Sequence, residues 1–260
     1  MMVDFPDLVR AEVSRTDRTV RVYPLVPDIS AATLEHFILD ILFPRLIADA
    51  GELVVHGALV ARGEDAICLL GDSGLGKSTL SAALRGAGWR LLGDDAMELL
   101  NDGPGVTASA IYPSLRLHPD SLEQLFPEPP AGMSPVADYL DKYRLDPGDP
   151  ADPAETTRLR AVLLLGGEDG TNEVAVRPLT ALTLCMALVR QSFALDPVDP
   201  AAAHGRLGAA SAVAATVPGF ALNYPRDYAR LPEVIDLVRD TLDRVGTNTR
   251  QEMAAPIALP

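Results

Sequence analysis

Residues 67–95 read ICLLGDSGLGKSTLSAALRGAGWRLLGDD, and this stretch decides the fold. It begins with an apolar run, continues through a glycine-rich segment at 71–78 that matches G-x-x-x-x-G-K-[ST], and then has the pattern of a short helix. A second apolar run ends at two aspartates, Asp94 and Asp95. A strand, a glycine loop, a helix and another strand in this order are typical of an α/β protein.

The glycine-rich segment has the composition of a phosphate-binding loop. Its glycines let the backbone adopt positive φ angles and bring N–H groups close to an anion, and the following helix adds its positive N-terminal end. Lys77 can reach the β and γ phosphates of a nucleotide, and the Ser78 hydroxyl is placed to coordinate Mg²⁺. We therefore predict a nucleotide site formed by Gly71, Asp72, Ser73, Gly74, Leu75, Gly76, Lys77, Ser78 and Thr79.

The alternative is a glycine-rich turn that merely links a strand to a helix. Against it, the segment follows an apolar run and opens a helix, as a phosphate-binding loop does. Its lysine is also one of only two, Lys77 and Lys142, among 22 basic residues. The chain has no N-K-x-D motif that would select guanine.

Two adjacent carboxylates, Asp94 and Asp95, follow the next predicted strand. Ligands in open α/β sheets bind at the carboxyl ends of strands, and we expect this strand to lie beside the loop strand. Both carboxylates should then face the γ-phosphate, one near Mg²⁺ and the other accepting a proton from an incoming hydroxyl. The alternative is a solvated turn with a helix-capping aspartate.

A single histidine, His56, lies in the middle of the apolar run LVVHGALVA at 53–61. A histidine inside an apolar strand is usually a core residue whose ring is satisfied by the backbone. The neighbouring Gly57 permits a close approach of another backbone, which slightly favours a site.

The chain before the loop predicts an appendage and the start of a sheet. Residues 1–29 alternate loosely and predict one or two strands. Ser30 can cap a helix that Pro44 kinks or splits. The apolar runs 53–61 and 66–71 then predict buried strands joined by a turn.

After Asp95 the sequence alternates between strand, loop and helix patterns. Residues 127–156 are rich in proline, aspartate and glycine, and predict a surface excursion with at most one short helix near 136–142. The other predicted elements are a hairpin across 101–105, a hairpin between 159–166 and 173–179, helices over 178–190 and 200–215, a strand at 220–224 and a helix over 232–245.

The length of 260 residues has room for one large α/β domain with a small extra unit. The sequence shows no internal repeat and no clean linker. We therefore predict a small α+β appendage over 1–50, a sheet flanked by helices over 51–246, and a flexible tail over 247–260.

The composition excludes several classes of protein. With 22 basic and 36 acidic residues the net charge is −14, which disfavours nucleic acid or an anionic membrane as a partner. No apolar run approaches the roughly 18–20 residues that a membrane-spanning helix requires, and the N-terminus lacks the apolar core of a signal peptide. Cys68 and Cys185 form no metal-binding spacing, so we expect a reduced, cytoplasmic setting.

Residues 56–95, HGALVARGEDAICLLGDSGLGKSTLSAALRGAGWRLLGDD, resemble the catalytic domain of HPr kinase/phosphorylase, a family of bacterial enzymes that phosphorylate a serine of the sugar-transport carrier HPr. The resemblance implies an HPr-kinase-like fold that uses ATP and Mg²⁺. It also implies that His56 is the active-site histidine, Lys77 the phosphate-binding lysine and Ser78 the Mg²⁺ ligand. Asp95 matches the general base for the acceptor serine, which leaves Asp94 for the metal.

The rest of the chain is closer to the HPr kinase-like enzymes of natural-product clusters, notably lasso peptide precursor kinases. The similar segments are residues 36–60, YPSLRLHPDS at 112–121, the isolated Lys142 and residues 220–238. This likeness implies that the acceptor is the C-terminal serine of a precursor peptide.

The chain also departs from the HPr enzymes. Ser114 stands where they have a glutamate that helps to hold Mg²⁺, so Asp94 or Asp120 would have to replace that glutamate. The later arginine- and glycine-rich loop used in dephosphorylation has no clear counterpart, so we expect a kinase without strong phosphorylase activity. The HPr enzymes are hexamers; for this chain the oligomeric state stays open, a homo-oligomer included.

Three further cations, Arg116, Lys142 and Arg144, could bind the transferring phosphate or a carboxylate of the acceptor. The alternative for each of them is a surface ion pair. His36, His118 and His204 are expected to be surface or packing residues.

Three functions fit these residues. The first is an ATP-dependent kinase for a peptide or protein serine, with Asp95 accepting the proton. The second is a nucleotide-dependent switch that binds a biosynthetic partner and forms no phosphorylated product. The third is a small-molecule kinase, for which the sequence has no sugar- or nucleoside-specific motif.

Overall fold

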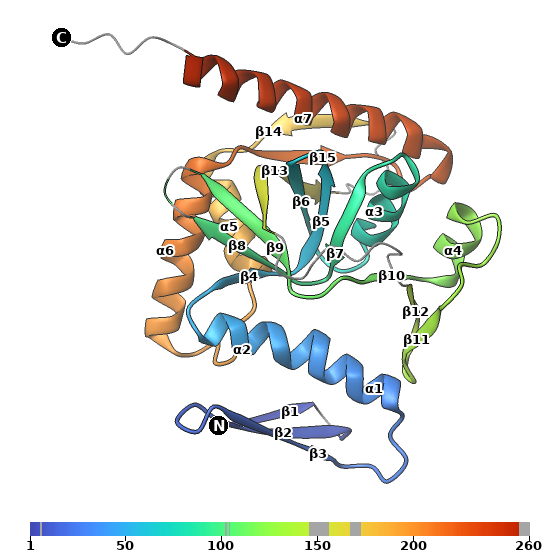
Figure 1. Cartoon of the computed structure of the whole chain (residues 1–260), viewed down its shortest axis with the longest axis vertical. Coiled ribbons are helices and arrows are strands. Elements are labelled where there is room, and N and C mark those ends of the chain that lie inside the picture. Colours follow the sequence, from blue (N-terminus) through green and yellow to red (C-terminus); the bar gives the residue numbers. More distant parts are fainter. Residues whose placement is uncertain (6, 102, 104, 146–155, 167–172, 255–260) are drawn as a thin grey trace.

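A mixed nine-stranded sheet forms the centre of the molecule in the computed structural model (Figure 1). The structure describes residues 1–5, 7–101, 103, 105–145, 156–166 and 173–254. The strands of the sheet are β4 (Leu53–Val55), β5 (Gly57–Arg62), β6 (Asp65–Leu70), β7 (Arg90–Asp94), β8 (Met97–Asn101), β9 (Val106–Ala110), β13 (Thr157–Gly166), β14 (Ala175–Pro178) and β15 (Gly219–Asn223).

The strand order is β4-β8-β9-β13-β6-β5-β7, with β15 pairing β13 and β14. Strand β13 runs parallel to β6 and to β15. Strand β5 is antiparallel to both β6 and β7, so β7 runs in the same direction as β6. The carboxyl ends of β6, β7, β13 and β15 therefore meet at one edge of the sheet, where α/β proteins bind their ligands.

Helices cover both faces of this sheet, giving a three-layer α/β architecture, as predicted. Helices α3 (Lys77–Gly86) and α7 (Leu231–Ala254) pack on one face, and α5 (Ala181–Gln191) and α6 (Pro200–Thr216) on the other. Along β6, Ile67 and Leu69 face α3 and α7, whereas Cys68 and Leu70 face α5 and α6. Burial on both faces explains why residues 66–70 of this strand are all apolar.

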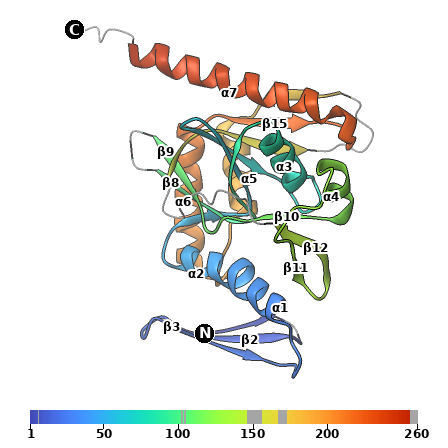
Figure 2. The ribbon, with the colours of Figure 1, turned by 45° about the vertical axis from the view of Figure 1, so that its right-hand side comes forward.

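The N-terminal region forms a separate layer on the side of helices α1 and α2 away from the central sheet (Figure 2). It contains β1 (Met2–Phe5), β2 (Val9–Ser14) and β3 (Thr19–Pro24), where we predicted one or two strands. The alternating Val9, Ala11 and Val13 of β2 pack against Phe37 and Leu42. The strand β1, whose residues alternate only weakly in burial, was missed for that reason.

The helix predicted after Ser30 consists of α1 (Ala31–His36), a π-helical segment η1 (Phe37–Leu42) and α2 (Phe43–Asp49). Ser30 caps α1 by accepting a hydrogen bond from the Thr33 N–H, as predicted. Pro44 lies at the start of α2, directly after the π-helical segment. Residues 31–49 are helical without a break, so Pro44 does not split the helix.

A small three-stranded sheet made of β10 (Leu115–Leu117), β11 (Ser134–Ala137) and β12 (Leu140–Leu145) follows, together with α4 (Pro119–Leu125). We allowed at most one short helix near 136–142, and the structure has none at these residues; β11 and β12 form a hairpin there instead. Thr33 of α1 donates to the Asp138 carboxylate and accepts from its N–H, so a tertiary contact holds the turn of this hairpin. Residues 146–155 of the predicted excursion lie outside the described residues.

Several other predictions were confirmed. The hairpin across 101–105 is formed by β8 and β9, and the strands on either side of residue 63 pair as β5 and β6. Helices α5 and α6 lie within a few residues of the predicted bounds. None of the helices in the described ranges combines the length and apolar character needed to cross a bilayer.

Three predictions about strands were wrong, because apolar runs reveal strands but not their partners. The run 53–61 is broken at His56, where the chain passes from pairing β8 to pairing β6 and β7. Strand β7 lies beside β5 rather than beside β6, and β15 separates β13 from β14. Helix α7 extends to Ala254 and so includes residues 247–254 of the predicted tail.

Candidate nucleotide-binding site

The loop between β6 and α3 has the backbone conformation that its glycines predict. The φ angles of Gly71, Gly74 and Gly76 are +148°, +81° and +86°, a region that residues with a side chain rarely adopt. Helix α3 begins at Lys77, directly after the last of these glycines. The N–H groups of the first turn of α3 therefore point toward the loop, as an anion site requires.

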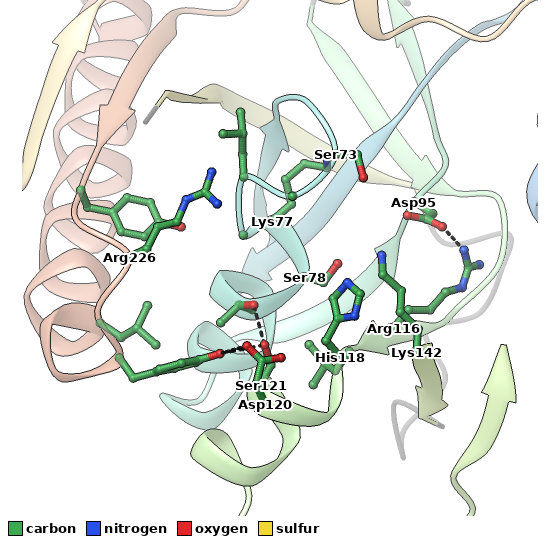
Figure 3. Close-up of a pocket in the computed structure, with 18 of the residues that line it drawn as sticks. Ser73, Lys77, Ser78, Asp95, Arg116, His118, Asp120, Ser121, Lys142 and Arg226 are labelled. Atoms are coloured by element: carbon green, nitrogen blue, oxygen red, sulfur yellow. Dashed lines mark hydrogen bonds and ion pairs between the residues drawn. The ribbon is translucent and has the colours of Figure 1, made fainter. Parts of the chain in front are cut away.

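This loop lines a pocket of about 280 Å³ at the sheet edge where the parallel strands end (Figure 3). Residues 73–79 of the loop form one side, which we name the loop wall. His56, Asp95, Arg116 and Lys142 form a second side, which we name the assembled wall because its members come from different elements. The structure thus brings both groups of predicted residues to one cavity.

Lys77 is 94% buried and folds back over the loop. Its Nζ donates hydrogen bonds to the carbonyl oxygens of Gly71 at 2.8 Å and Asp72 at 3.2 Å. Burial lowers the pKa of the Lys77 ammonium, and the nearby Asp94 carboxylate works in the opposite direction. The ammonium is thereby held at the floor of the pocket, beside the first turn of α3.

Asp94 lies beneath the pocket and does not line it, whereas we predicted that both carboxylates face the γ-phosphate. It is fully buried, and its Oδ2 accepts a hydrogen bond from the Arg116 backbone N–H at 3.3 Å. Burial raises the pKa of the Asp94 carboxyl, and a hydrogen bond with Ser78 and the positive charge of Arg116 oppose that rise. Asp94 is paired with Ala58 of β5, which packs on the face of the sheet that α3 covers, and its side chain lies on the same face beside Ser78.

Ser78 and Asp94 provide hard oxygen ligands of the kind that Mg²⁺ prefers. Oδ1 of Asp94 is buried and has no hydrogen-bond partner among the described residues, so it retains an unused acceptor. The described part of the chain holds no cluster of three or more His, Cys, Asp or Glu side chains suited to a metal. Mg²⁺ in phosphate-binding enzymes is usually held by one or two protein ligands plus phosphate oxygens, and this donor set fits that mode.

Asp95, the residue after Asp94, has φ +85°, which is unusual for a residue with a side chain. Its N–H donates to the Gly57 carbonyl at 2.7 Å, and its own carbonyl accepts from the Gly57 N–H at 3.3 Å. A Cβ on residue 57 would lie 2.5 Å from the Leu69 carbonyl oxygen. Only glycine therefore lets the backbone of residue 57 approach the backbone of β6 so closely, as predicted. The turned backbone directs the Asp95 side chain into the pocket (Figure 3).

The His56 ring lies beside Asp95. Its Nδ1 is 3.0 Å from the Asp95 carbonyl oxygen, which can only accept, so Nδ1 carries the proton and Nε2 is an acceptor. Burial, together with the charges of Lys77, Lys142 and Arg116, lowers the pKa of His56 to about 3. The ring is therefore neutral near pH 7.

Arg116 fastens the assembled wall to the N-terminal helices. Its guanidinium is 98% buried, and it pairs with Asp95 through Nη1 and with Asp40 of η1 through Nη2 at 2.6 Å. The Tyr112 hydroxyl accepts a further hydrogen bond from Nη2 at 2.6 Å. Arg116 is therefore a buried bridge between two carboxylates rather than a surface ion pair.

Asp40 is the acceptor at the centre of this network. It also takes hydrogen bonds from His36 and, at 3.4 Å, from Arg144. Although burial acts in the opposite direction, the His36 hydrogen bond and the Arg116 charge hold the pKa of the Asp40 carboxyl below its usual value. No sequence pattern connects Asp40 with Arg116, because the contact depends on how η1 packs against β10.

The remaining predicted site residues lie in different places. Arg144 pairs with Glu35 and Asp40 and does not line the pocket. Asp72 also points away from it, accepting hydrogen bonds from Arg190 at 2.7 Å and Gln191 at 2.8 Å. Lys142 does line the pocket and makes no hydrogen bond or ion pair with any described residue.

Two pocket segments were missed as site residues by the sequence reasoning. One follows β15, and the fact that β15 ends at the ligand-binding edge could have revealed it. The other is the start of α4, where only Asp120 had been considered, and where Ser121 accepts or donates a hydrogen bond with Thr79 at 3.0 Å. The pocket residues from these segments are Tyr224, Arg226, Asp227, Tyr228, Leu231, His118, Asp120 and Ser121.

No protein-family model matches the chain, and no curated protein matches it. Among solved structures, the chain is similar to the Hpr(Ser) kinase/phosphatase from Coxiella burnetii, with a TM-score of 0.41 and 12% sequence identity. The match covers 78% of this chain and 99% of that chain. The α/β fold class itself stands on the strand order and helix packing described above.

Proposed function

We propose that the chain is an ATP-dependent kinase that transfers the γ-phosphate of ATP to a serine hydroxyl of a peptide or protein. The observation that carries this proposal is that residues 73–79 and Asp95 line the same pocket. A phosphate cradle and a carboxylate that can accept a proton are the two parts that phosphoryl transfer to a hydroxyl requires.

The loop wall supplies the phosphate contacts. Backbone N–H groups between Gly71 and Thr79 bind phosphate oxygens, and the Lys77 ammonium adds a full positive charge close to the β and γ phosphates. Mg²⁺ held by Ser78 and Asp94 would neutralise charge on the β- and γ-phosphate oxygens when bound. Lys142 brings a second ammonium, which has no ion-pair partner among the described residues, to the opposite side of the pocket.

The assembled wall handles the acceptor. As the serine oxygen bonds to the γ-phosphorus, the bond from that phosphorus to the β–γ bridging oxygen breaks and ADP leaves. The serine proton passes to the Asp95 carboxylate. An ordinary aspartate is a weak base, so its contribution is to orient the hydroxyl and to accept the proton late, with Arg116 holding the carboxylate in position.

Neutral His56 adds an acceptor nitrogen beside Asp95. The ring has its proton fixed on Nδ1 by the Asp95 carbonyl, so Nε2 can accept a hydrogen bond from a polar group in the cavity. We assign His56 to binding and orienting the acceptor.

The acceptor is proposed to be the C-terminal serine of a lasso-type precursor peptide, which is what the resemblance of the later segments implies. An acidic chain with a net charge of −14 also fits a peptide or protein partner better than nucleic acid. A cytoplasmic location and a possible homo-oligomer belong to the same proposal.

The test is to incubate the full chain with Mg²⁺, ATP labelled at the γ-phosphate and a set of peptides that end in serine. A labelled peptide, formed by the wild type and not by a Lys77→Ala variant, supports the kinase. Release of labelled phosphate without a labelled peptide would favour a nucleotide-dependent switch instead. Label that appears only on an added small hydroxyl compound would favour a small-molecule kinase.

A further inference from the structure

A second cavity, of about 460 Å³, lies on another side of His56. Val3 of β1, Arg45 of α2, and the segment from Arg190 to Leu195, which spans the end of α5 and the residues after it, line it. His56 lines both this cavity and the nucleotide pocket, so its ring forms part of the wall between them. A molecule in the second cavity would therefore lie next to the assembled wall without occupying the phosphate site.

Arg45 is the charged group of this cavity that lacks a counter-ion. Its guanidinium carbon is 5.3 Å from the centre of the Phe193 ring, and Nη1 donates to the Ile41 carbonyl. Within the described parts of the chain, no carboxylate lies at ion-pair distance from it. Burial lowers the pKa of Arg45, but a guanidinium stays charged at any physiological pH.

Three other arginines near the two cavities differ from Arg45 in this respect, whereas Arg226 of the nucleotide pocket is exposed. Arg116 and Arg144 pair with Asp40, and Arg190 pairs with Asp72 at 2.7 Å. In a chain with 36 acidic residues, a half-buried arginine without an acidic partner stands out. Its free N–H groups form a planar fork that suits a carboxylate.

The surroundings of Arg45 would strengthen an ion pair between its guanidinium and a carboxylate. Val3, Phe193 and Leu195 supply apolar surface, and charges attract more strongly where water is partly excluded. The wall is also held in place: the His56 N–H donates to the Gln191 carbonyl at 2.7 Å, and the Phe193 N–H donates to the Val54 carbonyl at 2.9 Å. The site is thus formed before any ligand arrives, which lowers the entropic cost of binding.

We infer that the second cavity binds the acceptor, and that Arg45 pairs with a carboxylate next to the reacting serine. This inference rests on the proposed kinase function and gives the acceptor a chemical class. The predicted anchors Arg116 and Arg144 are already neutralised by carboxylates of the chain, whereas Arg45 is not. The reacting serine would then lie beside His56, the residue that lines both cavities.

The test uses two peptides of identical sequence that end in serine, one with a free terminal carboxylate and one with a terminal amide. Binding of each to the full chain is measured by calorimetry in the presence of a non-hydrolysable ATP analogue. We expect the wild type to bind the acid about tenfold more tightly than the amide, the effect of one charge-assisted hydrogen-bonded pair. Equal affinities for the two peptides, or no measurable binding of either one, would overturn the inference.

Three variants test whether Arg45 causes the preference for the acid peptide. Arg45→Gln should lose the preference for the acid, and Arg45→Lys, which keeps the charge but not the fork, should retain part of it. Arg62→Gln removes an exposed arginine that pairs with Asp243, and should leave the preference unchanged. A folded Arg45→Gln variant that keeps the full preference would show that Arg45 is not the anchor.

The nucleotide titration separates the two proposals. Wild type and Arg45→Gln should bind Mg·ATP equally, because Arg45 does not line the nucleotide pocket. If the wild type binds ATP and phosphorylates acid and amide peptides equally well, the acceptor inference fails and the kinase proposal stands. If the wild type binds no ATP, the kinase proposal fails.

Discussion

The loop wall and the assembled wall of the same pocket are built in different ways. The loop wall is a continuous stretch whose main contacts are internal, such as those of Lys77 with the Gly71 and Asp72 carbonyls. The assembled wall joins residues as far apart as His56 and Lys142, and its geometry depends on the ion pairs of Arg116. The first wall is a local structure and the second is a product of packing.

This difference has a consequence for mutations. Changes in the loop wall should act on nucleotide binding directly, because the phosphate contacts are backbone groups and one lysine. Changes in the assembled wall should leave nucleotide binding intact and act on transfer. Substitutions in the N-terminal helices, which are remote from the loop, should affect only the assembled wall, because they act on it through the ion pair between Asp40 and Arg116.

The largest expected effect is that of Lys77→Ala. Removal of the ammonium should lower the rate of phosphate transfer by at least about a thousandfold, since charge stabilisation in phosphoryl transfer is worth that much. ATP affinity, measured by calorimetry, should fall as well. The matched control is Lys142→Ala, the other lysine of the chain, which should keep its ATP affinity within a few fold; equal losses in both variants would contradict a special role of the loop wall.

Asp95→Asn comes next. Loss of the proton acceptor should lower transfer by about a hundred- to ten-thousandfold, the usual contribution of general base catalysis. ATP affinity should stay within about threefold, because the carboxylate touches the acceptor side only. Asparagine is chosen because it tolerates the positive φ of this position.

The check for Asp95→Asn is a single-turnover measurement of phosphopeptide formation beside a binding titration. Transfer at near wild-type rate would remove Asp95 from the mechanism. Loss of both transfer and ATP binding would mean that the two walls are not separable.

Asp40→Asn tests the connection between helix η1 and the assembled wall, which runs through Arg116. Without the carboxylate, Arg116 keeps a buried charge with one partner fewer, so unfolding should cost about 3 kcal/mol less, as found when one member of a buried pair is removed. Urea unfolding measures this difference. The control is Asp4→Asn, whose pair with Arg10 is about half exposed, so that its loss should leave the free energy of unfolding essentially unchanged.

The same variant also sharpens the comparison between the walls. If Asp40 holds the assembled wall through Arg116, folded Asp40→Asn protein should transfer phosphate more slowly but bind ATP as the wild type does. A variant that is destabilised yet transfers at the full rate would show that the network supports the fold and not the site.

The smallest expected effect is a pH dependence from His56. Its pKa is about 3 in the folded protein and near 6.5 when unfolded, so the unfolded state binds more protons between these values. The free energy of unfolding should therefore fall as pH decreases from 6.5 toward 3, by at most about 1.4 kcal/mol per pH unit from this one group. His56→Gln should flatten that slope between pH 6.5 and 5, where carboxylates contribute little; an unchanged slope would place the His56 pKa near its ordinary value.

Much of the fold could be predicted from the sequence because its signals are local. Apolar runs predicted β5, β6 and β13. The pattern of apolar residues, together with glycine turns and helix caps, predicted the bounds of α3, α5 and α6 to within a few residues. The hairpin near residues 136–142 was missed because a contact with Thr33, distant in the sequence, holds it. The partner of β7 was also missed, since the composition of this strand does not say whether it lies beside β5 or beside β6.

The candidate site likewise has one part that is determined by local sequence and one part that is determined by tertiary contacts. The sequence by itself determined the loop from Gly71 to Thr79, because glycine backbone freedom and one lysine act within a few residues of each other. Only the tertiary structure decided that Asp94 is buried beneath the pocket while Asp95 faces it, and that Arg116 and Arg144 are occupied by Asp40. The physical reason is that backbone conformation follows from neighbouring residues, whereas the partner of a charge depends on which elements pack against it.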